Sequence, residues 1–154
     1  FMSSVLKPDC QFRPMLENDL DAVMAIEPTI SLHPWTRGNF NDSLKSGHAA
    51  WVLTRQDEIV GYSLMSIVLD EAELLNISVA APYQQQGLGR LLMAHILKHA
   101  ITLGAAVMFL EVRASNAAAI ALYERASFVG VNVRRGYYPV ENGREDAVIM
   151  KVAL

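Results

Sequence analysis

The stretch Val79-Ala80-Ala81-Pro82-Tyr83-Gln84-Gln85-Gln86-Gly87-Leu88-Gly89-Arg90 joins an apolar strand to an amphipathic helix. It is the segment of the sequence most informative about the fold. Gly87 and Gly89 stand where the helix begins, so the N–H groups of its first turn, which have no helical partner, point into the loop. Because glycine lacks a Cβ atom, the backbone there can approach a ligand closely. The sequence therefore predicts a loop that binds an anion at a helix N-terminus.

Two familiar nucleotide-binding loops do not fit this stretch. A P-loop ends in Gly-Lys-Ser/Thr, and a dinucleotide-binding fingerprint has a third small residue where Leu92 stands. A third interpretation is that the two glycines merely begin a helix, and an isolated Gly-x-Gly supports nothing more. The elements on either side of the loop are needed to choose between an anion-binding loop and a plain helix start.

Outward from the loop, the spacing of apolar residues predicts a mixed sheet with helices on its faces, in the α/β (α+β) class. The element order is β-α-α-β-β-β-α-β-α-β-β, and Pro28 and Pro34 interrupt the chain after the first helix. Helices are expected over residues 17–27, 36–45, 88–103 and 116–126, and strands over 49–54, 59–69, 73–79 and 106–112, followed by two strands around the Asn142-Gly143 turn.

Length and composition predict one folded domain over residues 2–154, with Phe1 before Met2 taken as a residue of the expression vector. Hydrophobic residues make up 52% and charged residues 19% of the 154, which supplies a core. The net charge of −3 argues against a nucleic-acid partner. No apolar run reaches the roughly 18 residues of a membrane span. With a single cysteine and no signal sequence, a cytoplasmic location is expected.

The motif Gln84-x-x-Gly87-x-Gly89 after a strand resembles the acyl-CoA pyrophosphate loop of the GNAT N-acetyltransferase superfamily. The resemblance covers nearly the whole chain and is strongest to the RimI-type ribosomal-protein-alanine N-acetyltransferases. It extends to Leu75-Asn76-Ile77-Ser78-Val79, Leu110-Glu111-Val112-Arg113-Ala114-Ser115-Asn116 and Ala121-Leu122-Tyr123-Glu124.

This resemblance implies a GNAT fold in which the fourth strand, ending at Val79, splays from the fifth strand, ending at Glu111. Acetyl-CoA, the expected co-substrate, places its pantetheine arm between the two strands. The cofactor-binding residues implied are Ile77, Ser78 and Val79 for that arm, and Gln84, Gln85, Gln86, Gly87, Leu88, Gly89 and Arg90 for the pyrophosphate.

Glu111 and Tyr123 are the candidate catalytic residues. Glu111 ends an apolar strand, where sheet ligands tend to bind, although it could also pair with Arg113 or face solvent. Tyr123 follows Asn116 by seven residues and so shares a helix face with it, although it could be a core aromatic. The resemblance implies that Glu111 is the general base, Tyr123 the general acid and Asn116 a side-chain contact to the cofactor.

These residue types suit direct acetyl transfer within a ternary complex. An α-amine has a pKa of about 8, roughly 2.5 units below that of lysine, so a carboxylate, directly or through water, can deprotonate it. A phenol with a pKa near 10 can return a proton to a departing thiolate of pKa about 8.5. No metal is expected to take part.

The acceptor is inferred from resemblance alone. The resemblance implies that three aromatic residues form the walls of the acceptor site: Trp35, in the loop after Pro34, and Tyr137 and Tyr138, in the last hairpin. The favoured acceptor is the N-terminal alanine of a small-subunit ribosomal protein. Alternatives are another protein N-terminus, a small amine, or a regulator that binds acyl-CoA without catalysis.

Other reactive residues are set aside. Cys10 is expected to be a surface thiol, and His95 and His99 are expected on the solvated face of their helix, without the glutamate of a zinc motif. Two positions depart from the family pattern: Ser78 replaces an alanine and Ser127 replaces a glycine. If Ser127 needs a left-handed backbone, its cost is about 1 kcal/mol.

Overall fold

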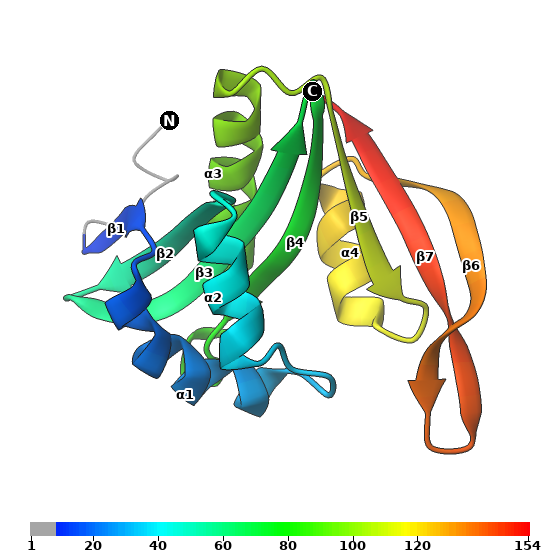
Figure 1. The fold of residues 1–154 in the computed structure, drawn as a ribbon, viewed down its shortest axis with the longest axis horizontal. Coiled ribbons are helices and arrows are strands. Elements are labelled where there is room, and N and C mark those ends of the chain that lie inside the picture. Colours follow the sequence, from blue (N-terminus) through cyan, green and yellow to red (C-terminus); the bar gives the residue numbers. More distant parts are fainter. Residues whose placement is uncertain (1–8) are drawn as a thin grey trace. The chain divides into compact units, whose positions relative to one another are not determined.

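The computed structural model describes residues 9–154 and confirms the expected order of elements (Figure 1). The strands are β1 (Cys10–Pro14), β2 (Ala49–Arg55), β3 (Glu58–Val68), β4 (Glu71–Val79), β5 (Val107–Arg113), β6 (Val129–Val140) and β7 (Gly143–Ala153). The helices are η2 (Glu17–Asp19), α1 (Leu20–Ile30), α2 (Arg37–Lys45), η3 (Ala81–Tyr83), α3 (Leu88–Thr102) and α4 (Ala117–Arg125).

The strands form a mixed sheet, as predicted. Hydrogen-bonded neighbours run in the order β1-β2-β3-β4-β5-β7-β6. The pair β4 and β5 is parallel, with α3 in the crossover between them, whereas β1–β2, β2–β3, β5–β7 and β6–β7 are antiparallel. Parallel pairing joins Glu71–Glu73 to Val107–Phe109. The predicted splay lies beyond these pairs and stays a prediction.

The chain divides into two compact units. The first runs as far as Ser66 and includes Leu75–Ile96, and the second contains Ile67–Leu74 and Leu97–Leu154. The first unit therefore holds the glycine loop and Trp35, and the second holds Glu111, Tyr123 and the last hairpin. The expectation of one domain over residues 2–154 stays a prediction.

In the first unit, strand alternation builds two hydrophobic clusters on opposite faces of the sheet. Val52 and Tyr62 belong to the cluster packed under α1 and α2, whereas Leu53 and Val60 belong to the cluster under α3. Figure 1 shows α3 and the α1–α2 pair on opposite sides of β2–β4. The sheet of this unit is therefore covered on both faces.

Helix α1 continues through Pro28, contrary to the expectation that this proline ends it. Proline removes one intrahelical hydrogen bond and clashes with the preceding turn, which favours a helix end. Here only two helical residues follow, so few bonds depend on it. The Thr29 hydroxyl also donates to the Ile26 carbonyl at 2.6 Å, which satisfies one acceptor of the last turn.

Cys10 and His95 lie elsewhere than the sequence predicted. Cys10 is 1% exposed because β1, to which no residues were assigned from the sequence, pairs with β2 beneath α3. The His95 ring stacks on Phe12 at 3.8 Å between centroids and meets the edge of Trp51 at 4.8 Å. The histidine therefore uses its apolar body to pack on the sheet, which a count of polar positions does not reveal.

The second unit is built around β7, which pairs with β5 over seven residues and with β6 on its other side. Met108, Leu110 and Val112 alternate along β5 into its core, which leaves Glu111 on the opposite face. Among the described residues, no helix is both long and apolar enough to cross a membrane.

Helix α4 ends in a Schellman motif that orients Tyr123. The Phe128 N–H bonds to the Tyr123 carbonyl and the Ser127 N–H to the Glu124 carbonyl, both at 3.0 Å. Ser127 has φ +74°, so the left-handed backbone considered from the sequence is present. The Tyr123 and Phe128 rings also meet at 5.9 Å between centroids, the apolar contact that accompanies this motif.

We expect Ser127→Gly to stabilise the protein by up to about 1 kcal/mol, because glycine adopts this φ without a Cβ clash. Urea denaturation of the wild type and the variant measures the change. Ser127→Ala serves as the control, since alanine keeps the unfavourable φ and should not stabilise. A Ser127→Gly variant no more stable than Ser127→Ala would contradict this account of the turn.

Candidate functional site

The glycine loop in the first unit leaves backbone amides accessible. Gly87 has φ +83° with no atom within 4 Å of a Cβ built on it, and Gln85 also has positive φ. The Leu91 N–H bonds to the Gly87 carbonyl, so the amides of Leu88, Gly89 and Arg90 precede the first helical bond and have no helical partner. Amides without helical partners at a helix N-terminus, next to the open space at Gly87, suit a phosphate group.

The side chains of the loop fasten it to its neighbours. Gln84 Nε2 donates to the Val79 carbonyl at 2.9 Å, so the loop is tied to the end of β4. Gln86 Oε1 accepts from Arg55 Nη1 at 3.2 Å, and Arg55 also pairs with Asp9 at 3.0 Å. Arg55 places a cation beside the loop, and because it lies thirty residues earlier, the loop sequence gave no signal for it.

The end of β4 approaches β3 closely at Gly61. A Cβ at this glycine would lie 2.8 Å from the Ser78 carbonyl, so no other residue fits without movement. The Ala80 N–H bonds to the Val60 carbonyl at 2.9 Å, and the Ser78 hydroxyl donates to Asn76 Oδ1 at 2.7 Å. Ile77, Ser78 and Val79 are therefore half-buried but held firmly on the β3 side.

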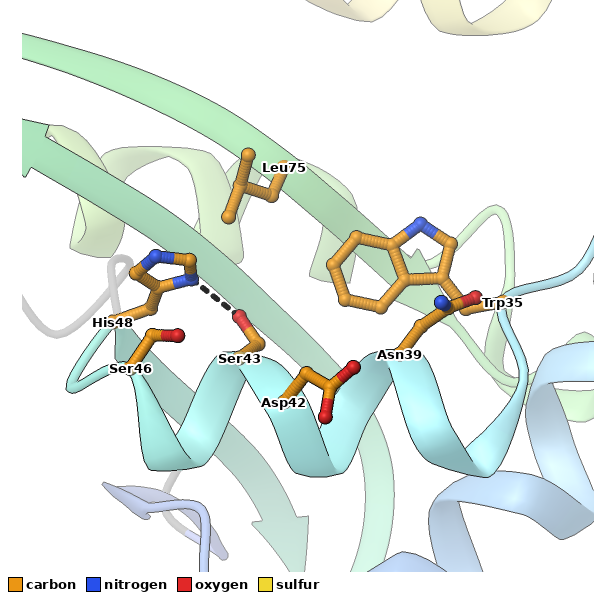
Figure 2. A pocket seen from close by; sticks show the side chains of 7 residues that line it. All are labelled: Trp35, Asn39, Asp42, Ser43, Ser46, His48 and Leu75. Atoms are coloured by element: carbon orange, nitrogen blue, oxygen red, sulfur yellow. Dashed lines mark hydrogen bonds between the residues drawn. The ribbon is translucent and has the colours of Figure 1, made fainter.

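Trp35 lies at the rim of a pocket of about 410 Å³ in the first unit. Figure 2 shows its ring beside Asn39 of α2, with Asp42 further along the helix and the hydrogen bond between Ser43 Oγ and His48 Nδ1, 2.6 Å long, at the other end. The pocket is lined by Trp35, Asn39, Asp42, Ser43, Ser46, His48 and Leu75. Trp35 thus borders open space, as an acceptor wall requires.

Glu111 lies near the C-terminal end of β5 and its side chain is 24% exposed. Both of its oxygens receive long hydrogen bonds from Arg134 Nη1, at 3.4 and 3.5 Å. The alternative partner considered from the sequence, Arg113, instead pairs with Glu145 at 3.0 Å. Arg134 comes from β6, and the sequence offered no register from which this pairing could be found.

Asn116 is the N-cap of α4 rather than a residue within the helix. Its Oδ1 accepts from the Ala119 N–H at 3.1 Å, which satisfies an amide of the first turn. The side-chain NH₂ points away from this bond and can serve a ligand. The predicted cofactor contact of Asn116 stays a prediction.

Tyr123 occupies the last turn of α4, and the pKa of its phenol is raised. Burial, and secondarily the neighbouring Tyr138, raise its pKa to about 12, above the value near 10 assumed from sequence. Burial and the charge of Glu111 also raise the pKa of Tyr138. Glu111, Tyr138 and Tyr123 therefore form one electrostatic neighbourhood within the second unit.

The last hairpin supplies the aromatic side chains expected from its sequence. Between Arg134↔Ala147 and Tyr138↔Glu145, β6 carries two more residues than β7, and this bulge presents Tyr137 and Tyr138. The Arg134 guanidinium lies 4.0 Å above the Tyr137 ring and that of Arg113 4.0 Å above the Tyr138 ring. Cation–π contacts thus join the hairpin to the neighbourhood of Glu111.

Residues 9–154 contain no group of three or more His, Cys, Asp or Glu side chains that could hold a metal ion.

The structure brings the candidate residues together as two sets. Trp35, Ile77–Val79 and the loop of Gln84–Arg90 share the first unit, and Glu111, Asn116, Tyr123, Tyr137 and Tyr138 share the second.

Comparison with known proteins identifies the family. A model described as the acetyltransferase (GNAT) family matches residues 17–128, more than half of the chain. The chain belongs to this family, and it is an acetyl-CoA-dependent acyltransferase.

Within this family, the chain is similar to ribosomal-protein-alanine N-acetyltransferases. The chain is 43% identical, over 136 residues, to the ribosomal protein bS18-alanine N-acetyltransferase of Escherichia coli strain K12, covering 88% of this chain and 92% of that protein. The Haemophilus influenzae protein of the same name is 35% identical over 133 residues, 86% and 90% of the two chains. The crystal structure of the ribosomal-protein-S18-alanine N-acetyltransferase from Escherichia coli gives a TM-score of 0.87 at 40% identity, covering 94% and 93%.

We expect Tyr123 to remain protonated well above pH 10, because its pKa of about 12 exceeds the value near 10 of an exposed tyrosine. NMR titration of protein labelled with ¹³C at tyrosine Cζ measures this, and the resonance lost in Tyr123→Phe gives the assignment. Since the folded-state pKa is the higher one, the neutral phenol stabilises the fold below about pH 10 and that contribution is lost as pH rises towards 12. A midpoint near 10 would contradict the burial described for Tyr123.

Proposed function

We propose that this chain transfers the acetyl group of acetyl-CoA to the N-terminal α-amine of a ribosomal protein whose first residue is alanine. The similarity to bS18-alanine N-acetyltransferases over nearly the whole chain carries this proposal. Glu111 and Tyr123 support it, because a carboxylate and a protonated phenol lie in the same unit and each interacts with Tyr138. The enzyme would meet its acceptor in the cytoplasm, where ribosomal proteins are made.

The first unit holds the donor in this proposal. Acetyl-CoA supplies the activated acetyl thioester. The amides of Leu88, Gly89 and Arg90 bind the pyrophosphate together with Gln84, Gln85, Gln86 and Gly87, because these amides lack helical partners at a helix N-terminus. Backbone groups of Ile77, Ser78 and Val79 pair with the pantetheine arm. Asn116, which belongs to the second unit, is a further proposed contact to the cofactor.

Glu111 acts as the general base. An N-terminal ammonium has a pKa of about 8, so a carboxylate can accept its proton directly or through one water at neutral pH. Arg134 holds the carboxylate through both oxygens, which limits the directions in which it can turn. Trp35 in the first unit and Tyr137 and Tyr138 in the second are the proposed contacts of the acceptor peptide.

Tyr123 acts as the general acid. As the amine nitrogen bonds to the acetyl carbon and the carbon–sulfur bond breaks, negative charge develops on sulfur. The phenol donates its hydrogen to that sulfur, and its raised pKa keeps it protonated at every working pH. Glu111 releases to water the proton it took from the ammonium and then accepts the second proton of the nitrogen, while the Tyr123 phenolate takes a proton back from water. The products are an amide, a free thiol and one proton released to solvent.

We expect Glu111→Gln and Tyr123→Phe each to lower kcat by roughly 100-fold to 10,000-fold, because each removes one proton transfer. The Kd for acetyl-CoA, measured by calorimetry, should change little, since neither side chain belongs to the loop. Rates are measured with a peptide that begins with alanine. Near-normal turnover in both variants would contradict the assigned roles.

We expect a strong preference for the α-amine over lysine. At pH 7.5 a larger fraction of an α-amine of pKa about 8 is neutral than of a lysine of pKa about 10.4, by roughly 100-fold or more. Mass spectrometry compares an alanine-first peptide, the same peptide with a blocked N-terminus and internal lysines, and small amines. Rapid acetylation of the blocked peptide or of a small amine would favour that acceptor instead. Acetyl-CoA binding without any product would favour a regulator.

A further inference from the structure

Glu27 is a buried carboxylate in α1 that the proposed reaction does not use. Its residue is 3% exposed, and its oxygens accept hydrogen bonds from three uncharged donors in three different elements. Oε2 accepts from the Trp35 N–H at 3.0 Å, and Oε1 accepts from the Tyr62 hydroxyl at 2.6 Å and from Asn76 Nδ2 at 3.4 Å. Burying a carboxylate is costly unless its oxygens accept hydrogen bonds, and the three donors together offset this cost for Glu27.

Two of the three donors belong to parts of the first unit that the proposed reaction needs. Trp35 is the acceptor wall in the loop before α2. Asn76 in β4 accepts from the Ser78 hydroxyl at 2.7 Å, so the same cluster reaches the strand proposed to hold the pantetheine arm. Tyr62 in β3 is 0% exposed and anchors the carboxylate to the sheet.

A second contact fixes the same tryptophan through its ring. The Trp35 ring meets the Phe40 ring at 5.0 Å between centroids, and Phe40 meets Tyr62 edge-on at 5.7 Å. The backbone of Trp35 is therefore held by Glu27 and its side chain by Phe40. Loss of either support would displace the wall of the pocket, whereas a phenylalanine at position 62 keeps the ring that Phe40 contacts.

We infer that Glu27 is a positioning residue for the acceptor, which fixes the Trp35 loop against β3 and β4 so that the acceptor wall stays aligned with the cofactor strand. This inference rests on the proposed function, in which Trp35 contacts the peptide. Its effect should appear in peptide binding rather than in the chemical step, since Glu27 bonds to the backbone of the wall and not to Glu111 or Tyr123.

Glu27→Gln tests the inference with almost no change in shape. An amide has one acceptor oxygen, so it cannot serve donors on both sides, and its NH₂ must face at least one N–H. The side chain can turn either way: with its NH₂ towards the Trp35 N–H it releases the loop, whereas with its NH₂ towards the Tyr62 hydroxyl, which can accept, it keeps the Trp35 bond and loses only the long Asn76 contact. Exchange of the Trp35 amide identifies the arrangement, and if the bond is kept, Glu27→Ala, which has no acceptor, must show the peptide effect. Tyr62→Phe is the matched control, because it removes one buried bond of the same carboxylate and leaves the Trp35 bond intact.

Steady-state kinetics with acetyl-CoA and an alanine-first peptide should show a peptide KM raised roughly tenfold or more in Glu27→Gln, the effect of losing a hydrogen bond to a charged acceptor. Its kcat and acetyl-CoA KM should stay within about threefold, and Tyr62→Phe should keep a peptide KM within about threefold. Hydrogen exchange of the Trp35 amide should accelerate in Glu27→Gln alone.

The outcomes are distinguishable. If the KM for peptide and the KM for acetyl-CoA rise equally in Glu27→Gln and Tyr62→Phe, Glu27 only stabilises the fold. If the peptide KM of Glu27→Gln is unchanged although its Trp35 amide exchanges faster, Trp35 is not part of the acceptor site. Either result overturns the inference. If Glu27→Gln does not fold, Glu27→Asp, which is one methylene shorter, must show the peptide effect. A wild-type protein that acetylates no N-terminus would instead overturn the proposed function, while the exchange of the Trp35 amide would still report on the bond.

Discussion

The antiparallel pairing of β5 with β7 is the constraint on which the proposed catalytic residues depend. Seven consecutive residue pairs fix the register, so Glu111 lies opposite Ile149 and cannot move along the strand without breaking the ladder. The other edge of β7 holds β6, which brings Arg134 to Glu111 and the bulge with Tyr138 beside it. A one-residue slip would turn Glu111 into the core and Leu110 or Val112 outwards.

A second constraint orients the phenol. Tyr123 belongs to the last turn of α4, and the Schellman motif fixes its carbonyl while Phe128 packs on its ring. The burial that results raises its pKa to about 12, which suits an acid that must not ionise, and it makes the phenol a still weaker acid relative to a thiol of pKa about 8.5. Transfer of the proton to sulfur is therefore uphill by itself and requires that the nitrogen lose its proton in the same reaction, which ties donation to breakage of the carbon–sulfur bond.

Local patterns in the sequence predicted the order of the elements and the glycine loop before a helix, whereas the catalytic roles of Glu111 and Tyr123 came from the family resemblance and stay proposals. The patterns failed where distant segments meet. Cys10 is buried because β1 pairs with β2, His95 packs because Phe12 and Trp51 face it, and Arg134 reaches Glu111 through strand register. Glu27 was unremarkable in sequence, since its donors lie eight, 35 and 49 residues away.

A crystal structure with a bisubstrate analogue, coenzyme A joined to the α-amine of an alanine-first peptide, tests the central claim most directly. The account predicts that the peptide nitrogen lies within hydrogen-bond reach of the Glu111 carboxylate, directly or through one water, and that the Tyr123 hydroxyl contacts the sulfur position. It also predicts pyrophosphate oxygens on the amides of Leu88–Arg90. An analogue whose nitrogen and sulfur lie away from both side chains would contradict the account.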